Sequence, residues 1–161
     1  IEQEEKKENL TNTFNALLEN GIIPIVNEND SVSYTEIESK DRLFGDNDML
    51  SAVVSVLVQA KRLVIFSDID GFYEADPRFH PQARLIGRVE EIDESLYNLA
   101  GGAGSRRGTG GMKTKLQAAE LATRQGIDVT VCNGKRPEAL YDIVNGLPAG
   151  TLFAGRMPMS I

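Results

Sequence analysis

A cluster of glycines, lysines and threonines leads into a helical pattern in the stretch Gly108-Thr109-Gly110-Gly111-Met112-Lys113-Thr114-Lys115-Leu116-Gln117-Ala118-Ala119-Glu120-Leu121-Ala122. Glycine has no Cβ, so the backbone of such a cluster can approach a ligand closely. The first turn of a helix presents unpaired N–H groups and the positive end of the helix dipole. A glycine-rich segment with two lysines at this place is typical of a phosphate-binding site.

The spacing separates this stretch from the two common phosphate-binding motifs. It does not match the P-loop pattern G-x-x-x-x-G-K-[ST], and it departs from the dinucleotide pattern G-x-G-x-x-G because Lys113 stands at the last glycine position. Lys113 and Lys115 lie about 200° apart around a helix, so they cannot serve one ligand equally. A lysine in the first turn opposes the helix dipole by about 0.3–1 kcal/mol, which a bound anion offsets. The alternative is an ordinary loop whose lysines are only solvated.

The composition limits the classes of protein to consider. The chain has 161 residues, the size of one domain, and 41% of them are hydrophobic. The net charge of −7 argues against nucleic acid or an anionic membrane as a partner. The single cysteine, Cys132, lies in an apolar run and is expected to be a small buried residue, which favours a cytoplasmic protein. With His80 as the only histidine, the sequence also argues against a catalytic triad and a zinc site.

Strands and helices alternate along the chain, which predicts an α/β fold: a three-layer α/β/α sandwich with a mainly parallel sheet. Residues 22–26 are a continuous apolar run, typical of a strand buried on both faces. The expected elements are helices at 8–20, 49–60, 91–100, from the glycine cluster to about 125 and at 137–144, and strands at 22–26, 63–66, near 85–86, 127–132 and 151–153, the last at a sheet edge. The helix at 49–60 is apolar nearly all round, so we expect it to be deeply buried.

Polar groups directly follow three of the predicted strands, at residues 27–30, 67–71 and 133–134. Because ligands of parallel sheets gather at the carboxyl ends of the strands, these groups are expected to share one crevice. Asp68 could accept hydrogen bonds from a sugar or a base, or help to organise Mg²⁺. Each group could equally be an ordinary turn, and position alone gives it functional weight.

A second acidic cluster stands at Asp46, Asn47 and Asp48, directly before a predicted helix. Asn47 or Asp48 would be a good N-cap, which is the simplest interpretation. Carboxylates at a helix N-terminus also stay ionised, so they could orient a substrate ammonium, a lysine or Mg²⁺. The spacing alone leaves both interpretations open.

With these residues in view, the chain resembles the glutamate 5-kinase branch of the amino acid kinase family from about Phe14 to Phe153. Five motifs in the same order carry the resemblance: Ile25-Val26-Asn27-Glu28-Asn29-Asp30, Gly45-Asp46-Asn47-Asp48-Met49-Leu50-Ser51-Ala52, Ser67-Asp68-Ile69-Asp70-Gly71-Phe72-Tyr73 with Asp76-Pro77-Arg78, Gly108-Thr109-Gly110-Gly111-Met112 with Thr114-Lys115-Leu116-Gln117-Ala118-Ala119, and Gly150-Thr151-Leu152-Phe153. The resemblance implies transfer of the ATP γ-phosphate to the γ-carboxylate of L-glutamate, the first step of proline synthesis, with ATP and Mg²⁺ as cofactors.

The resemblance also implies roles for particular residues of this chain. Asp30 and Asn47 would contact the substrate, and Asp46 and Asp48 would organise the active centre together with Lys115, which would contact phosphate. The implied nucleotide-binding residues are Ser67, Asp68, Thr109, Gly110, Gly111, Met112, Lys113, Thr114 and Lys115. No residue of this chain is assigned as a metal ligand.

The resemblance implies that residues 1–161 are the C-terminal, nucleotide-binding portion of the kinase domain. The family carries, before this portion, a loop with a lysine for the ATP phosphates and a loop for glutamate. It also carries in some members an RNA-binding-like domain after this portion. Residues 38–44 appear longer than the family's usual link, which affects the expected glutamate site. Core surface exposed on the N-terminal side would favour a homo-oligomer. The alternatives are an aspartate, acetylglutamate or uridylate kinase, or a nucleotide-binding piece without catalysis.

Overall fold

The computed structural model describes residues 2–27, 47–101 and 109–156 of the chain. Its elements follow the predicted alternation of helices and strands. They are α1 (Glu2–Glu19), α2 (Asn47–Leu57), β1 (Arg62–Ser67), β2 (Arg88–Val89), α3 (Glu94–Ala100), α4 (Thr109–Thr123), β3 (Asp128–Asn133), α5 (Ala139–Val144) and β4 (Thr151–Phe153). No helix of the described residues is long and apolar enough to cross a membrane.

The described strands form a four-stranded sheet in the order β1-β3-β4-β2. β1 pairs with β3 in parallel, and β2 pairs with β4 in parallel, while β3 and β4 are antiparallel. The β1–β3 register places Ser67 opposite Asn133, so the two strands end level with each other. The mainly parallel sheet is therefore confirmed, and the polar groups after β1 and β3 emerge at one edge.

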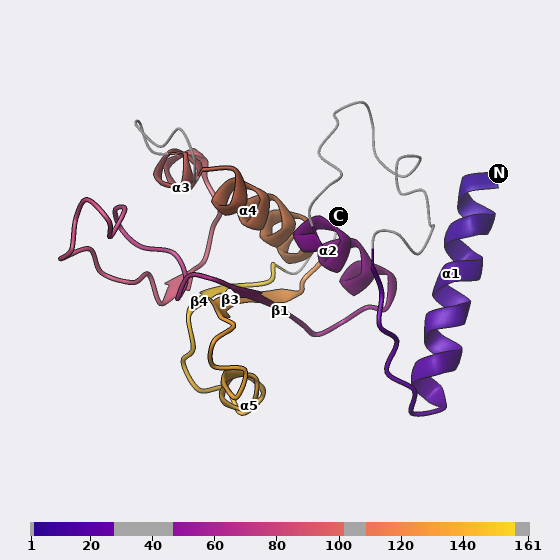
Figure 1. Cartoon of the computed structure of the whole chain (residues 1–161). Helices are drawn as coiled ribbons and strands as arrows, with labels where there is room; N and C mark the ends of the chain where they lie inside the picture. Colours follow the sequence, from indigo (N-terminus) through magenta and orange to yellow (C-terminus); the bar gives the residue numbers. More distant parts are fainter. Residues whose placement is uncertain (1, 28–46, 102–108, 157–161) are drawn as a thin grey trace.

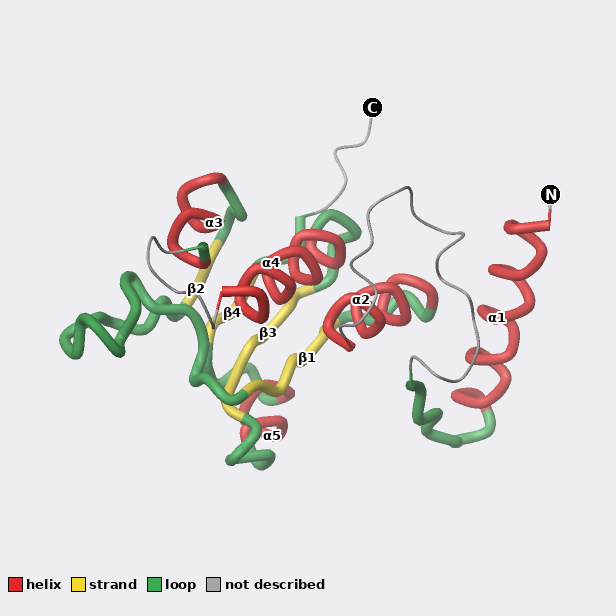
Figure 2. Tube along the Cα trace, turned by 45° about the horizontal axis from the view of Figure 1, so that its top comes forward, coloured by secondary structure: helices red, strands yellow, loops and turns green. Residues whose placement is uncertain are grey.

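Helices cover both faces of this sheet, as expected for a three-layer sandwich. Figure 1 shows α2, α3 and α4 on one face and α5 on the other. In Figure 2, α2 and α4 run side by side above β1 and β3. In both figures α1 lies apart from the sheet, beyond α2.

The core lies between the sheet and α4. The side chains of Leu116, Ala118, Ala119 and Ala122 are fully buried, because they form the inner face of α4. They belong to one cluster with the inward residues of β3 and with Ala52 of α2. Alanines on both helices allow their backbones to approach closely, and this close packing fixes the position of one helix start relative to the other.

Two strand predictions are wrong. Residues 22–27 form no strand, and Ile23 and Ile25 are 85% and 94% exposed. An apolar run specifies a preference for burial, but a strand also needs a neighbouring backbone to pair with, and β1 pairs on one side only in the described residues. β4 is an internal strand rather than an edge strand, because it pairs with β3 on one side and with β2 on the other. The short strand lies at β2, and residues 73 and 85 form only an isolated bridge.

Two helix predictions also need correction. α2 has Ala52, Ser55 and Leu57 buried, but its other apolar side chains are only half-buried, because one side of the helix faces an open cavity. α4 begins at Thr109, inside the glycine cluster, so its glycines form the first helical turn rather than a preceding loop. The helix predictions for α3 and α5 are confirmed to within three residues of their ends, and α1 is confirmed but begins at Glu2, six residues before its predicted start.

Candidate active site

The start of α2 and the start of α4 meet at the carboxyl end of the sheet. α2 leads into β1 and α4 leads into β3, so each helix runs opposite to its strand. Because β1 and β3 are parallel neighbours, both helix N-termini are brought to the edge where these strands end. The positive ends of two helix dipoles thus converge beside the polar strand ends, which is an arrangement suited to an anion.

Lys115 and Asp48 form an ion pair at this meeting point. The Lys115 Nζ donates to Asp48 Oδ2 over 2.9 Å, and their side chains are only 15% and 12% exposed. The Thr114 hydroxyl donates to the Gly111 carbonyl at 3.0 Å and also lies 3.4 Å from Asp48 Oδ2. Asp48 of the acidic cluster therefore orients a lysine, which is one of the three cations that the sequence suggested.

The two lysines of α4 point in different directions, as the helical spacing predicts. Lys113 is exposed, while Lys115 is directed toward α2. Met112 packs against the core cluster, so its side chain supports the helix. Beside the backbone of Gly111 there is open space where a Cβ would stand. The surface of α4 that faces the crevice is therefore made by its backbone, Thr114 and Lys115.

Asn47 and Asp48 lie in the first turn of α2, since the helix begins at Asn47. Neither is an N-cap outside the helix, so that prediction is wrong by about one residue, within the ordinary uncertainty of helix ends. Asp30 and Asp46 lie outside the described residues, as does the segment 38–44. Thr109 and Gly110 belong to the first turn of α4, and their side-chain positions are not described.

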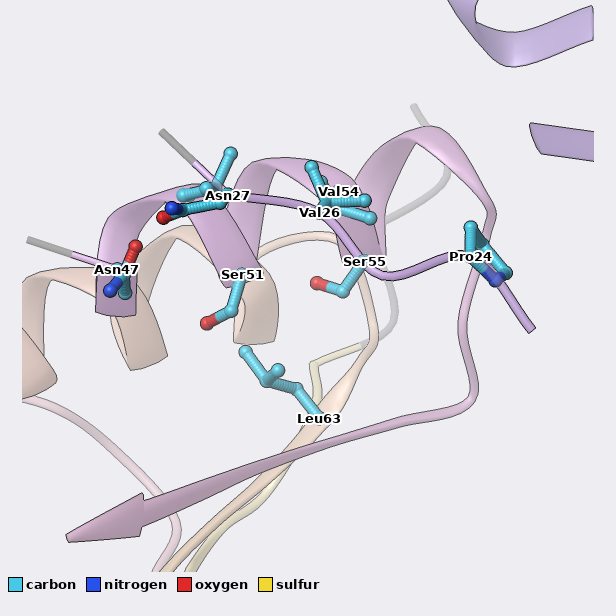
Figure 3. A pocket seen from close by; sticks show the side chains of 9 residues that line it. Pro24, Val26, Asn27, Asn47, Ser51, Val54, Ser55 and Leu63 are labelled. Carbon is cyan, nitrogen blue, oxygen red and sulfur yellow. The ribbon is translucent and has the colours of Figure 1, made fainter. Parts of the chain in front are cut away.

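An open cavity of about 440 Å³ lies between residues 24–27 and α2. Figure 3 shows Asn27 and Asn47 at one end of it, with Ser51 nearby, and Pro24 at the other end. Its lining residues are Pro24, Val26, Asn27, Asn47, Leu50, Ser51, Val54, Ser55 and Leu63. The expected proximity of the polar group at 27–30 to Asn47 is thus seen for Asn27, and most of the cavity wall is apolar.

The turn after β1 is the third part of the site. The Ser67 hydroxyl donates to Asp68 Oδ1 at 3.1 Å, and Asp68 is exposed at the edge of the sheet. The Ser67 carbonyl accepts from the Gly134 N–H at 2.8 Å, which joins this turn to the end of β3. Two of the three polar groups predicted to share a crevice therefore lie together at the ends of β1 and β3, whereas Asn27 of the third lines the cavity beside α2 and residues 28–30 lie outside the described residues.

Cys132 is buried at the end of β3, as the apolar run predicts, and its burial raises the pKa of the thiol. The described residues contain no group of three or more His, Cys, Asp or Glu side chains that could hold a metal ion.

A sequence model of the amino acid kinase family matches residues 1–133. The chain belongs to the amino acid kinase family. It is 54% identical over 156 residues to a protein of Clostridium perfringens named glutamate 5-kinase, covering 97% of this chain and 58% of that protein. It is 49% identical over 153 residues to the glutamate 5-kinase of Enterococcus faecalis, covering 95% and 56%. The chain thus spans about half the length of the curated relatives it matches.

Solved structures of amino acid kinase fold agree with this family. The chain superimposes on isopentenyl phosphate kinase of T. acidophilum with a TM-score of 0.50 and 23% identity, over 67% of this chain and 39% of that one. It superimposes on UMP kinase of Bacillus anthracis with a TM-score of 0.50 and 18% identity, over 71% and 42%. Identity this low supports the fold alone.

Sequence reasoning missed the residues that hold the β1 turn from behind. The Thr151 hydroxyl accepts from the Phe72 N–H at 2.8 Å and donates to the Ile86 carbonyl at 2.7 Å. Gly150 has a φ of +68°, and a Cβ there would lie 2.9 Å from the Asp70 carbonyl oxygen. In the sequence, Gly150 and Thr151 stood out only as the Gly-Thr of the last family motif. Their contacts with residues up to 80 positions away leave no signal in a single sequence.

Proposed function

We propose that the protein, together with the remainder of the kinase domain found in its relatives, transfers the ATP γ-phosphate to the γ-carboxylate of L-glutamate, giving glutamyl 5-phosphate in the cytoplasm for proline synthesis. The observation that carries this proposal is the Lys115–Asp48 pair at the converging starts of α4 and α2. The names of the relatives at about 50% identity supply the substrate.

In this proposal the first turn of α4 binds the ATP phosphates. Its free N–H groups and dipole favour a phosphate, and the open space beside Gly111 lets phosphate oxygens approach the backbone. Thr109, Gly110, Gly111, Lys113 and Thr114 would surround the phosphates, while Met112 would anchor the helix in the core. Ser67 and Asp68 would contact the ribose or base at the end of β1.

Lys115 is proposed to neutralise charge as the phosphoryl group moves. Phosphoryl transfer depends mainly on positioning and electrostatic stabilisation. Asp48 holds the Lys115 ammonium at 2.9 Å, so the cation is in place before any ligand arrives. The γ-carboxylate of glutamate is ionised at neutral pH and needs no general base. Mg²⁺, when bound, would be held largely by the nucleotide with Asp68 helping, and would neutralise charge on the phosphates.

Asp30 and Asn47 are proposed to bind glutamate, and Asp46 is proposed to organise the active centre together with Asp48 and Lys115. Asn47 and Asn27 provide amide groups at the polar end of the cavity in Figure 3. Amide oxygens can accept from the substrate ammonium, and amide N–H groups can donate to a carboxylate. This places the acceptor next to Asp48 and the donor phosphate next to Lys115.

The first experiment is thermal unfolding of the chain with MgATP, using MgGTP as the control. A ligand at 100 times its Kd stabilises the native state by about 2.7 kcal/mol. A shift in Tm with MgATP and a smaller one with MgGTP would support the nucleotide site. Absence of any shift at millimolar MgATP would contradict ATP binding by this chain.

The second experiment measures ADP release with L-glutamate, L-aspartate, N-acetyl-L-glutamate and UMP as acceptors. Release that depends on L-glutamate supports the proposal, and release with another acceptor assigns another activity of the family. A chain that binds MgATP but releases no ADP with any acceptor is a nucleotide-binding piece, the second candidate. Sedimentation in the same buffer tests the proposed homo-oligomer.

A further inference from the structure

The turns after β1 and β3 are joined by side chains as well as by the sheet. The Asn133 amide Nδ2 donates to Asp70 Oδ1 over 2.8 Å, across 63 positions of the chain. The other Asp70 oxygen, Oδ2, accepts from the Tyr73 hydroxyl at 3.0 Å. With the bond from the Gly134 N–H to the Ser67 carbonyl, the two turns are joined at two points, while the Tyr73–Asp70 bond lies within the turn after β1.

Asp70 has no role in the site described above. Both of its carboxylate oxygens accept from donors of the chain itself, so its contacts are structural ones. The bond from Asn133, then that from Tyr73, holds the pKa of the Asp70 carboxyl below its usual value, with a smaller effect of the Lys135 charge. Asp70 therefore remains ionised at neutral pH and keeps its two donors in place.

Asn133 uses its other end to shape the turn that follows β3. Its Oδ1 accepts from the Lys135 backbone N–H at 3.0 Å, so one amide group orders its own turn and reaches the turn of β1. An amide offers both a donor and an acceptor, and a carboxylate at this position would offer only acceptors. The contact therefore requires a donor at Asn133 and an acceptor at Asp70.

The turn after β1 cannot move away from Asn133 toward β4, because β4 packs closely against it. A Cβ on Gly71 would lie 2.6 Å from Thr151 Oγ1, and one on Gly150 would lie 2.9 Å from the Asp70 carbonyl oxygen. Backbone therefore packs directly behind the turn, and Asp70 in the turn accepts from Asn133 and Tyr73. Together these contacts specify one position for Ser67 and Asp68.

We propose that Asp70 is a positioning residue, which through Asn133 fixes the turn carrying Ser67 and Asp68 relative to the end of β3 and thereby sets the affinity for the nucleotide. This inference rests on the proposed nucleotide site for its functional consequence, and on the contacts of Asp70 for its structural one. A displacement of a ligand-binding group by about 1 Å weakens binding even when the fold persists.

The test exchanges the two partners. Asn133→Asp sets a carboxylate against Asp70, whereas the double variant Asp70→Asn with Asn133→Asp restores one donor and one acceptor in reversed order. Asn133→Leu removes the donor without adding charge. Each variant is measured for MgATP affinity by calorimetry, for Tm, and for hydrogen exchange of the Gly134 amide, which reports the bond to Ser67.

We expect Asn133→Asp and Asn133→Leu each to weaken MgATP binding about tenfold and to speed exchange at Gly134 by a similar factor. The double variant should return both quantities to within about threefold of the parent. Recovery of Tm in the double variant without recovery of its MgATP affinity would overturn the inference. Normal MgATP affinity in Asn133→Leu would also overturn it, because the effect of Asn133→Asp would then come from charge alone.

MgATP affinity and hydrogen exchange at Gly134 together distinguish a failure of this inference from a failure of the proposed function. If the parent chain binds no MgATP, the nucleotide site fails, and faster exchange at Gly134 in the single variants with recovery in the double variant still supports the positioning by Asp70. If exchange at Gly134 is unchanged in every variant, the positioning inference is overturned whether or not the parent binds MgATP.

Discussion

The ammonium of Lys115 lies 2.9 Å from the carboxylate of Asp48, and the two residues come from the second turn of α4 and the first turn of α2. The dipole of α2 stabilises the Asp48 carboxylate in its first turn, and Lys115 supplies a positive charge to this largely buried group. Paired, they bring a fixed positive charge to the edge of the sheet where β1 and β3 end.

Replacement of Lys115 tests this pair directly. Lys115→Met keeps the length of the side chain but removes the ammonium that pairs with the largely buried Asp48, so we expect a loss of about 1–3 kcal/mol in the free energy of unfolding. The stabilisation by MgATP should also fall, because a phosphate contact is removed. Lys113→Met, two residues away and exposed, is the matched control and should change unfolding little. Equal effects of the two variants would contradict the role of Lys115.

Gly150 tests the close packing behind the β1 turn. In Gly150→Ala the new Cβ would lie 2.1 Å from the Val131 carbonyl oxygen, which is backbone and cannot move aside. We expect a loss of about 3 kcal/mol or more, measured by urea unfolding. Gly146→Ala is the control, since Gly146 also has a positive φ, +77°, but has open space around it. Its loss should be about 1–2 kcal/mol, from backbone conformation alone.

Thr151 tests the hydrogen bonds that join the β1 turn to β4. Thr151→Val preserves the side-chain volume but leaves the buried Phe72 N–H and the Ile86 carbonyl without this partner. We expect a loss of about 1–3 kcal/mol in the free energy of unfolding. Thr130→Val is the control, because Thr130 is also buried and its hydroxyl makes no hydrogen bond among the described residues. That variant should be neutral or slightly more stable, and a large loss would argue against the reasoning.

Tyr97 gives the protein a dependence on alkaline pH. Its hydroxyl donates to Glu120 Oε2 at 2.6 Å, and burial, together with this carboxylate, raises the pKa of Tyr97 well above its usual value. In the unfolded chain the tyrosine ionises near pH 10, while in the native state it stays protonated. The stability from Tyr97 is therefore complete below pH 10 and falls as the pH rises further.

The measurement is Tm between pH 7 and pH 11. In Tyr97→Phe the Tm should be lower at pH 7, because the bond to Glu120 is lost, but it should fall less steeply above pH 10 than in the parent. Tyr141→Phe is the control, since Tyr141 is 73% exposed, and it should follow the parent curve. A parallel fall in all three proteins would contradict the assignment to Tyr97.

The sequence by itself determined the class of fold and, apart from the strand expected at residues 22–26, the alternation of helices and strands. Helical spacing separated Lys113 from Lys115 because a side chain's direction on a helix follows from its position in the chain. Apolar runs located β1 and β3, and the polar residues after them fell at one edge because parallel neighbours end together.

Only the tertiary structure decided which of these local preferences were met. The run Ile22–Val26 has the apolar character of a buried strand, yet it lies exposed beside α2, because pairing needs a partner backbone that local sequence does not specify. Contacts between distant segments place β4 inside the sheet and bring Asn133 into hydrogen-bonding distance of Asp70. Such contacts depend on how whole elements pack, so a periodicity read along one chain carries no information about them.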